Sequence, residues 1–312
     1  MALLELLGLF VLSLIVLIKA SGVFTGAAEK IGISFGIPSF IIGVTIVSIG
    51  TSLPELISSV LAVLNGSSEI VIGNVAGSNV TNIFFVLGVV AIAGKKLEID
   101  YELLQVDLPL LVGSAMLLYA TVADGVFTSG EAVVCLVGFI VYFLYALGVE
   151  KRLEGDGDVN RKGNGVGGSV LILLLSAVFI YLGAKYTIES IVRLSDELKI
   201  GKEIIAASAV ALGTSLPELM VSLTAAKNGK PEMAVGNLLG SNIFNSLAVM
   251  GVSGLVGVVI IPAGLLTFAL PLMVGATLLY AFITMDKQIT MWEGGFLVLF
   301  YLFYLGKLFN LL

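Results

Sequence analysis

Ten apolar segments, each about as long as a helix that crosses a bilayer, dominate this sequence. They lie at about residues 3–18, 39–64, 70–93, 103–122, 131–149, 169–187, 203–226, 232–259, 263–284 and 292–311. Hydrophobic residues make up 58% of the 312-residue chain and charged residues 12%, whereas about 25% of the residues in a soluble domain are charged. The sequence therefore predicts an all-α polytopic membrane protein surrounded by lipid. The chain contains no basic patch, so a nucleic-acid partner is not expected.

The chain is also internally duplicated. Residues 50–90 align without a gap on residues 213–253, and 21 of the 41 aligned positions are identical. We expect residues 1–150 and 169–312 to form two five-helix repeats, joined by a charged, Gly-rich linker at 151–168. Because five is odd, the second repeat has to enter the membrane from the opposite side. Ten transmembrane helices in two inverted repeats are typical of secondary transporters, whose substrate site lies near the middle of the membrane.

The distribution of basic residues predicts the orientation in the cell membrane. The odd-numbered connections between the ten segments contain eleven Lys and Arg residues, and the opposite side contains five. Because positive charge favours the cytoplasmic side, both termini are expected outside and the 151–168 linker inside.

The motif GTSLPE occurs once in each half, and its glutamates, Glu55 and Glu218, are the only charges in the apolar bodies of their segments. A carboxylate at the centre of a bilayer costs roughly 2.5–3.5 kcal/mol, so each glutamate should face a cavity and have a partner. Pro54 and Pro217 lack a backbone N–H and leave helix carbonyls without a donor. Carboxylates, carbonyls and hydroxyls are ligands for Ca²⁺ and Na⁺. The repeated motif therefore favours one cation site over two tolerated kinks.

A second motif, GNxxGSNxxN, places polar side chains four residues apart, and so along one helical face, in each half. These residues are Asn74, Ser78 and Asn82 in the first half, and Asn237, Ser241 and Asn245 in the second. For Asn74 and Asn237, hydrogen bonding between helices is an alternative to an ion-binding role. For the other four residues, cation coordination is favoured. The motif glycines, Gly73 and Gly77 with their counterparts Gly236 and Gly240, are spaced for close helix contact.

These paired motifs resemble the α-repeats of the sodium/calcium exchangers, in the cation/Ca²⁺ antiporter superfamily, and chiefly its small archaeal and bacterial members. The resemblance implies Na⁺/Ca²⁺ antiport by alternating access, no cofactor and no enzymatic activity, with residues 3–18 and 169–187 as a sliding gate. It implies that Glu55 and Glu218 bind Ca²⁺ together with the backbone carbonyls of Thr51 and Thr214. It assigns the Na⁺ sites to Ser52, Ser215, Ser78 and Ser241, and a central polar pair to Asn82 and Asn245.

The sequence departs from that family at the central pair, where many relatives have one Asp and this chain has Asn82 and Asn245. Two carboxylates remain, and they could also carry protons, so an H⁺/Ca²⁺ antiporter stays open as the alternative. An ion channel is disfavoured because inverted repeats are typical of carriers. A monomer is compatible with all of these interpretations. Asp107, in the fourth segment, has no counterpart in the second half, and it fits either an interfacial position or a role in the site.

Overall fold

A computed structural model of the protein describes residues 3–99, 106–153, 166–197, 213 and 215–309. Ten helical segments follow one another in the described residues. In the first half they are α1 (Leu3–Phe35), α2–η1–α3 (Ser39–Ile42, Gly43–Val47, Ser48–Leu64), α4–η2–α5 (Glu69–Val80, Thr81–Leu87, Gly88–Gly94), α6 (Asp107–Thr121) and α7 (Ser129–Leu153). In the second half they are α8 (Val166–Glu197), α10 (Leu216–Lys227), α11–η4–α12 (Pro231–Ile243, Phe244–Val249, Met250–Val256), η5–α13 (Leu265–Ala269, Leu270–Thr284) and α14 (Met291–Leu308).

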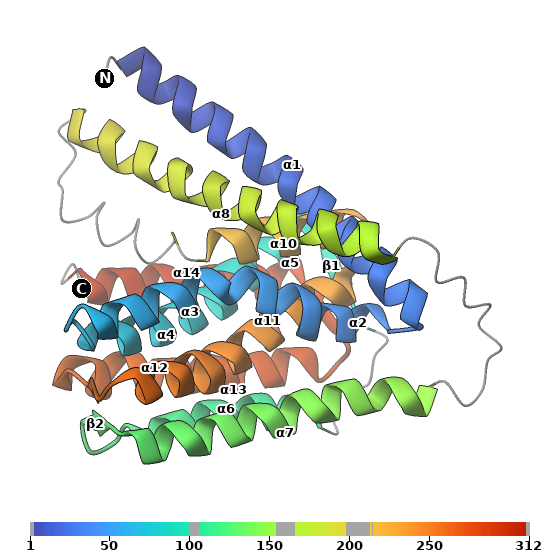
Figure 1. Ribbon diagram of the computed structural model, residues 1–312. Helices are drawn as coiled ribbons and strands as arrows, with labels where there is room; N and C mark the ends of the chain where they lie inside the picture. Colours follow the sequence, from blue (N-terminus) through green and yellow to red (C-terminus); the bar gives the residue numbers. More distant parts are fainter. Residues whose placement is uncertain (1–2, 100–105, 154–165, 198–212, 214, 310–312) are drawn as a thin grey trace.

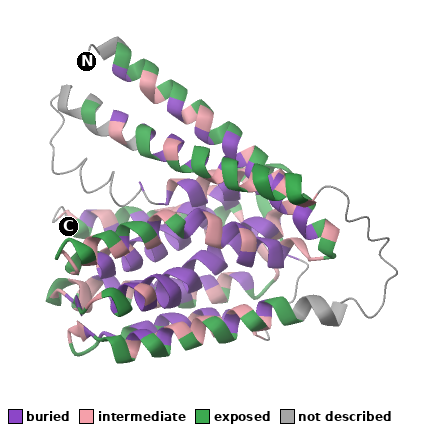
Figure 2. Ribbon diagram, in the orientation of Figure 1, coloured by how far each residue is buried: buried purple, intermediate pink, exposed green. Residues whose placement is uncertain are grey.

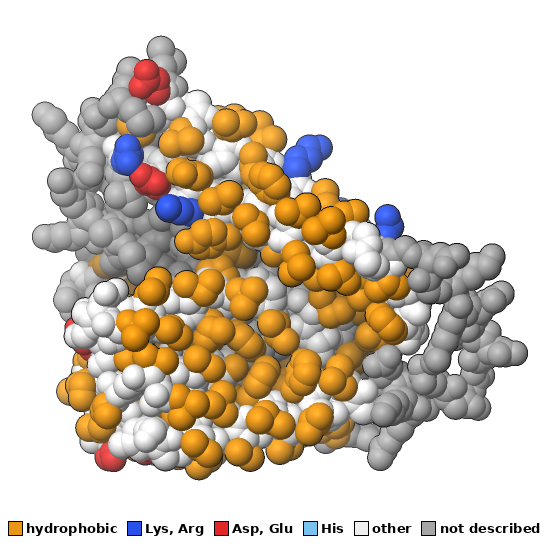
Figure 3. All heavy atoms as spheres, viewed as in Figure 1, with side chains coloured by type: hydrophobic (Ala, Val, Ile, Leu, Met, Phe, Trp, Pro, Cys, Tyr) orange, Lys and Arg blue, Asp and Glu red, His pale blue; other side chains and the backbone are white. Residues whose placement is uncertain are grey.

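The fold class predicted from the sequence is confirmed. In the part of the chain that the structure describes, seven helices are long and apolar enough to cross a membrane. Apolar side chains cover the visible face of the protein, while charged side chains lie near its margins (Figure 3). The two chain ends lie at the same end of the bundle, as an even number of crossings requires (Figure 1). The protein is therefore an all-helical membrane protein built from two repeated halves.

Two small antiparallel sheets connect the halves. Strand β1 (Lys96–Glu98) pairs with β4 (Gln288–Thr290), and β2 (Val126–Phe127) pairs with β3 (Val259–Ile260). Strands β1 and β3 occupy matching positions in the two repeats, each after the helix with the GNxxGSN motif. The chain crosses the bundle once between β1 and β2, through α6, so the two sheets lie at opposite ends of the molecule. This is the arrangement that an inverted repeat produces.

Helices α1 and α8 pack against each other as an inclined pair beside the other helices (Figure 1). Gly183 allows this contact, because a Cβ there would lie 2.9 Å from the backbone nitrogen of Leu17. Thr187 donates a hydrogen bond to Ser13 across the pair, with 3.0 Å between the oxygens. Both helices expose many side chains along their length, whereas the inner helices are largely buried (Figure 2).

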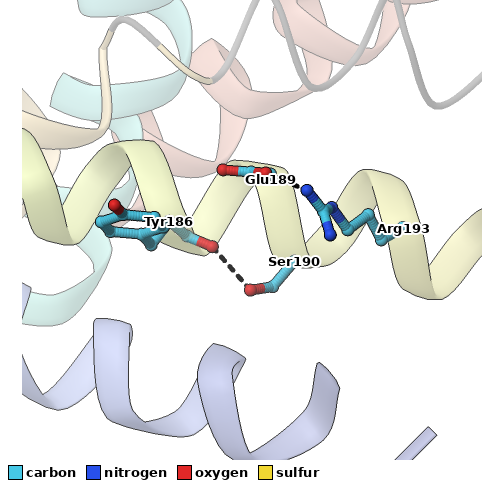
Figure 4. Close-up of polar contacts among 4 residues, drawn as sticks. All are labelled: Tyr186, Glu189, Ser190 and Arg193. Carbon is cyan, nitrogen blue, oxygen red and sulfur yellow. Dashed lines mark hydrogen bonds and ion pairs between the residues drawn. The ribbon is translucent and has the colours of Figure 1, made fainter. Parts of the chain in front are cut away.

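The boundaries expected for these two helices were wrong. Helix α1 continues from the predicted end at residue 18 to Phe35, and α8 continues from 187 to Glu197. The apolar pattern ends where charges begin, but a helix can continue in water or along a protein surface. Near the end of α8, Arg193 pairs with Glu189 one turn earlier, and Ser190 donates to the carbonyl of Tyr186 (Figure 4).

A close backbone contact between the halves joins η1 and α2 to α11. Added Cβ atoms at Gly236 and Gly240 would collide with the carbonyl oxygens of Phe40 and Val44. The glycine spacing in the second half therefore permits the close approach expected from the sequence. The residues of the second half that match Phe40 and Val44, at positions 203 and 207, fall outside the described residues.

Candidate cation site

The two motif glutamates lie inside the protein at matched positions. Glu55 lies in α3, and Glu218 lies in the first turn of α10; neither side chain has any solvent-exposed surface. Helix α3 packs against α10, and Ser52, one turn before Glu55, donates a hydrogen bond to Glu218, so the two glutamates lie near each other. Two buried negative charges in such proximity require cations or protons to balance them. The structure thus brings together the two charges that the sequence places 163 residues apart.

Nine of the ten residues predicted for the site are buried, and the tenth, Thr214, lies outside the described residues. Several of their oxygen atoms have no hydrogen-bond partner within the described part of the chain. These atoms are both carboxylate oxygens of Glu55, Oε2 of Glu218, Oδ1 of Asn82 and Asn245, and Oγ of Ser215 and Ser241. An unpaired buried polar group ordinarily costs about 1–3 kcal/mol. Seven such atoms belong to the predicted residues, and oxygen atoms of these kinds are the ligands that hard cations take.

Packing between the halves explains how these oxygens come together. Helix α3, which carries Glu55, packs against α10 and against η4, which carries Asn245. Helix α10, which carries Glu218, packs in turn against η2, which carries Asn82. Each glutamate-bearing helix therefore contacts the asparagine-bearing turn of the opposite half.

The two GTSLPE motifs make different hydrogen bonds. Ser52 donates to Oε1 of Glu218 at 3.1 Å, while the hydroxyl oxygen of Ser215 has no partner within the described residues. The hydroxyl of Thr51 donates to Oδ1 of Asn237 at 3.2 Å. The first motif therefore holds two groups of the second half in place through its side chains.

Asn74 and Asn237 lie between helices of the same half. Asn74 donates to Ser59 at 3.1 Å, and Asn237 donates at the matched position to Ser222 at 2.8 Å. Both contacts join the helix with the GNxxGSN motif to the helix with the glutamate. These bonds correspond to the alternative of hydrogen bonding between helices.

The central pair lies in two π-helical turns, η2 and η4, at matching positions in the two repeats. Asn82 donates through Nδ2 to Oδ1 of Asn242, and Asn245 donates to Oδ1 of Asn79; each bond is 3.2 Å long. These bonds are related by the symmetry of the repeats. Single π-turns inside α-helices occur frequently at functional sites.

Sequence reasoning missed Asn79, Asn242 and Ser246, which are buried around the central pair. The first two are the asparagines of the GSN triplet and are identical between the halves. That identity was a usable signal, but neither residue lies on the helical face formed by the residues four apart in the GNxxGSNxxN motif. Ser246 matches Ile83 and gave no such signal.

Asp107 occupies a different environment from the central residues. It is buried in the first turn of α6, and the hydroxyl of Tyr145 on α7 donates to its Oδ2 at 3.5 Å. Asp107 therefore lies at the beginning of a helix with its side chain buried, and its role stays a prediction.

The donor set is one of oxygen atoms. The sequence contains no histidine, and no group of three or more Cys, Asp or Glu side chains within the described ranges could hold a metal ion. A site of two carboxylates with amide and hydroxyl oxygens suits alkali and alkaline-earth cations rather than transition metals.

Comparisons with known proteins agree with this chemistry. Residues 5–148 and 168–309 match the protein family described as sodium/calcium exchanger protein. The chain is 34% identical to the sodium/calcium exchanger MaX1 of Methanosarcina acetivorans, over 96% of this chain and 97% of that protein. It is also 34% identical to the uncharacterized membrane protein MJ0091 of Methanocaldococcus jannaschii, over 96% and 97% of the two chains.

Solved structures of the sodium-calcium exchanger NCX_Mj have the same fold. One, soaked with zero Na⁺ and Ca²⁺, gives a TM-score of 0.85 at 29% identity and covers 98% of this chain and 99% of that chain. Another, soaked with Na⁺ and Sr²⁺, gives a TM-score of 0.83 at 30% identity, covering 96% and 98%.

Proposed function

Because the chain belongs to the sodium/calcium exchanger family and is a cation antiporter of that type, we propose that it exchanges Na⁺ for Ca²⁺ through one central site built from both GTSLPE motifs. The observation that carries this proposal is the set of buried, unpaired oxygens on Glu55, Glu218, Asn82, Asn245, Ser215 and Ser241. They come from both halves, and they include the two carboxylates needed to neutralise one divalent ion.

In this proposal, Glu55 and Glu218 bind Ca²⁺ with the backbone carbonyls of Thr51 and Thr214. Bringing a cation between two carboxylates replaces their repulsion by attraction, which is strong at low dielectric. Na⁺ ions bind at the motif serines Ser52 and Ser215 and at the GSN serines Ser78 and Ser241. Asn82 and Asn245 contribute neutral amide oxygens, so the site carries a charge of −2 when both glutamates are ionised.

Alternating access follows from movement of α1 and α8 past the remaining helices. Their contact with each other through Gly183 and the bond from Thr187 to Ser13 support movement as a pair. The excess of basic residues supports an orientation with both termini outside and the 151–168 linker in the cytoplasm.

Proton/calcium antiport is the second candidate. It is favoured by the lack of any hydrogen-bond donor to either carboxylate oxygen of Glu55 within the described residues. A buried carboxyl group without donors holds a proton more readily than one with several.

Uptake of ⁴⁵Ca²⁺ into proteoliposomes distinguishes the two candidates. Vesicles preloaded with Na⁺ at equal pH are compared with Na⁺-free vesicles that carry only a pH gradient. Uptake driven by Na⁺ alone is expected, and uptake driven by the pH gradient alone would replace the proposal by proton exchange. Vesicles with Glu55→Gln protein are the control for leak, because this variant lacks one of the two site charges.

A further inference from the structure

Four buried asparagines connect the two halves at the level of the π-helical turns. Asn82 and Asn245 each use the amide NH₂ group to bond the opposite half, through Oδ1 of Asn242 and of Asn79 respectively. Their own Oδ1 atoms accept no hydrogen bond within the described part of the chain. The amide nitrogens are thus turned toward the partner asparagines, and the carbonyl oxygens remain available to a cation.

The orientation of these amides matters because an asparagine side chain is polar at both ends. Rotation by 180° about its last bond exchanges the oxygen acceptor for an NH₂ donor. A cation that meets the NH₂ group gains no ligand and is repelled by its partial positive charge. An aspartate at the same position would present oxygen in either orientation, so only an asparagine needs to be oriented.

In one half, the partner asparagine is itself fixed. The two N–H groups of Asn79 have three acceptors within reach of Nδ2: Oγ of Ser246 at 2.8 Å, the backbone carbonyl of Asn242 at 3.2 Å and the sulfur of Met273 at 3.7 Å. With three acceptors on the nitrogen side, its Oδ1 faces Asn245. A chain of contacts therefore runs from Ser246 through Asn79 to Asn245.

The other half lacks this support. Ile83 stands at the position that matches Ser246, and Nδ2 of Asn242 has no hydrogen-bond partner within the described residues. Asn242 consequently holds Asn82 through one bond without being fixed by a hydroxyl itself. The side-chain carbonyl of Asn245 is therefore better fixed than that of Asn82, although the motif around them is repeated.

We infer that Asn79 and Asn242 are positioning residues. Asn79 directs the carbonyl oxygen of Asn245, and Asn242 directs that of Asn82, toward the transported cation. Ser246 secures this arrangement on one side only. The inference rests on the proposed function, since it concerns the same site.

The test is a double-mutant cycle between Asn79→Ala and Asn245→Asp. Transport in proteoliposomes gives KM and maximal rate for Ca²⁺, and equilibrium ⁴⁵Ca²⁺ binding is measured on the same proteins. Alone, Asn79→Ala should raise KM and weaken Ca²⁺ binding about tenfold, because Asn245 can then rotate. In the Asn245→Asp background the same change should have an effect of about twofold or less, because both carboxylate oxygens are equivalent. Equal losses in both backgrounds would mean that Asn79 is merely structural and would overturn the inference.

Two further sets of variants, with smaller changes, test the same role in case the Asn79→Ala protein does not fold. Ser246→Ala keeps all four asparagines and should weaken Ca²⁺ binding about threefold or more, again only while residue 245 is Asn. Ile83→Ser and Ile83→Ala remove similar volumes, but only the serine offers an acceptor to Asn242. The serine variant should bind Ca²⁺ more tightly than the alanine variant, and equal binding would refute the role of Asn242.

The proposed function and the positioning role can fail separately. Wild-type protein that binds Ca²⁺ but shows no Na⁺-driven uptake would contradict Na⁺/Ca²⁺ exchange. The Ca²⁺ affinities of the four proteins in the double-mutant cycle would still test the positioning role. Wild-type exchange with additive losses would retain the function and reject the positioning role.

Discussion

Ser52 and Ser215 offer a matched comparison because the repeat places them at the same position in the two motifs. Only Ser52 donates to a glutamate of the opposite half, Glu218, at 3.1 Å. Removing the donor of a buried hydrogen bond leaves its acceptor unpaired, which costs roughly 1–3 kcal/mol. Ser52→Ala should therefore lower the free energy of unfolding by about that amount in ion-free buffer. Ser215→Ala removes a hydroxyl with no partner in the described part of the chain, and should be nearly neutral.

Thermal unfolding of the purified protein in detergent measures the difference. At about 2 °C per kcal/mol, the value for large domains, the midpoint of Ser52→Ala should fall by about 2–6 °C relative to wild type. Saturating Ca²⁺ should narrow this gap, because the bound cation stabilises the carboxylate that lost its donor. Both proteins are compared with wild type in the same detergent, with and without the ion.

Equal midpoints for the two alanine variants in ion-free buffer would refute this reasoning. The bond from Ser52 would then contribute nothing, and the asymmetry between the motifs would have no energetic consequence. A gap that Ca²⁺ leaves unchanged would show that Glu218 is not a ligand of the bound ion.

Three further perturbations test other parts of the structure. Glu55→Gln and Glu218→Gln should each abolish Na⁺-driven ⁴⁵Ca²⁺ uptake, since either removes one of two site charges; near-normal uptake in both would exclude the assignment. Gly240→Ala should lower the free energy of unfolding by about 1–3 kcal/mol, because its Cβ would collide with η1. Gly113→Ala places a Cβ in open space and should leave the free energy of unfolding unchanged. Equal stability of these two variants in a denaturation assay would contradict the close contact. Lys230→Gln breaks a partly exposed ion pair with α1 and should cost less than about 1 kcal/mol, an effect that disappears in high salt; a larger loss that persists in high salt would point to a packing role.

The sequence determined the class of fold and the composition of the site. Apolar segments of membrane-spanning length require helices, because backbone groups in lipid must bond within their own segment. The 163-residue repeat places Glu55 and Glu218 at equivalent positions, and an odd number of helices per repeat inverts the second half. A charge in an apolar segment is expensive enough to identify both glutamates as functional candidates without any structure.

The tertiary structure alone decided how the two halves differ. Ser52 bonds the opposite glutamate while Ser215 does not, although their motifs are identical over GTSLPEL. Likewise, Asn79 donates a hydrogen bond to Ser246, whereas the first half has Ile83 at the matching position and Nδ2 of Asn242 has no partner within the described residues. Such bonds join residues about 160 positions apart, and they depend on the depth and rotation of packed helices. Local propensity and periodicity describe one helix at a time, so they cannot specify which of two identical side chains meets a partner across the interface.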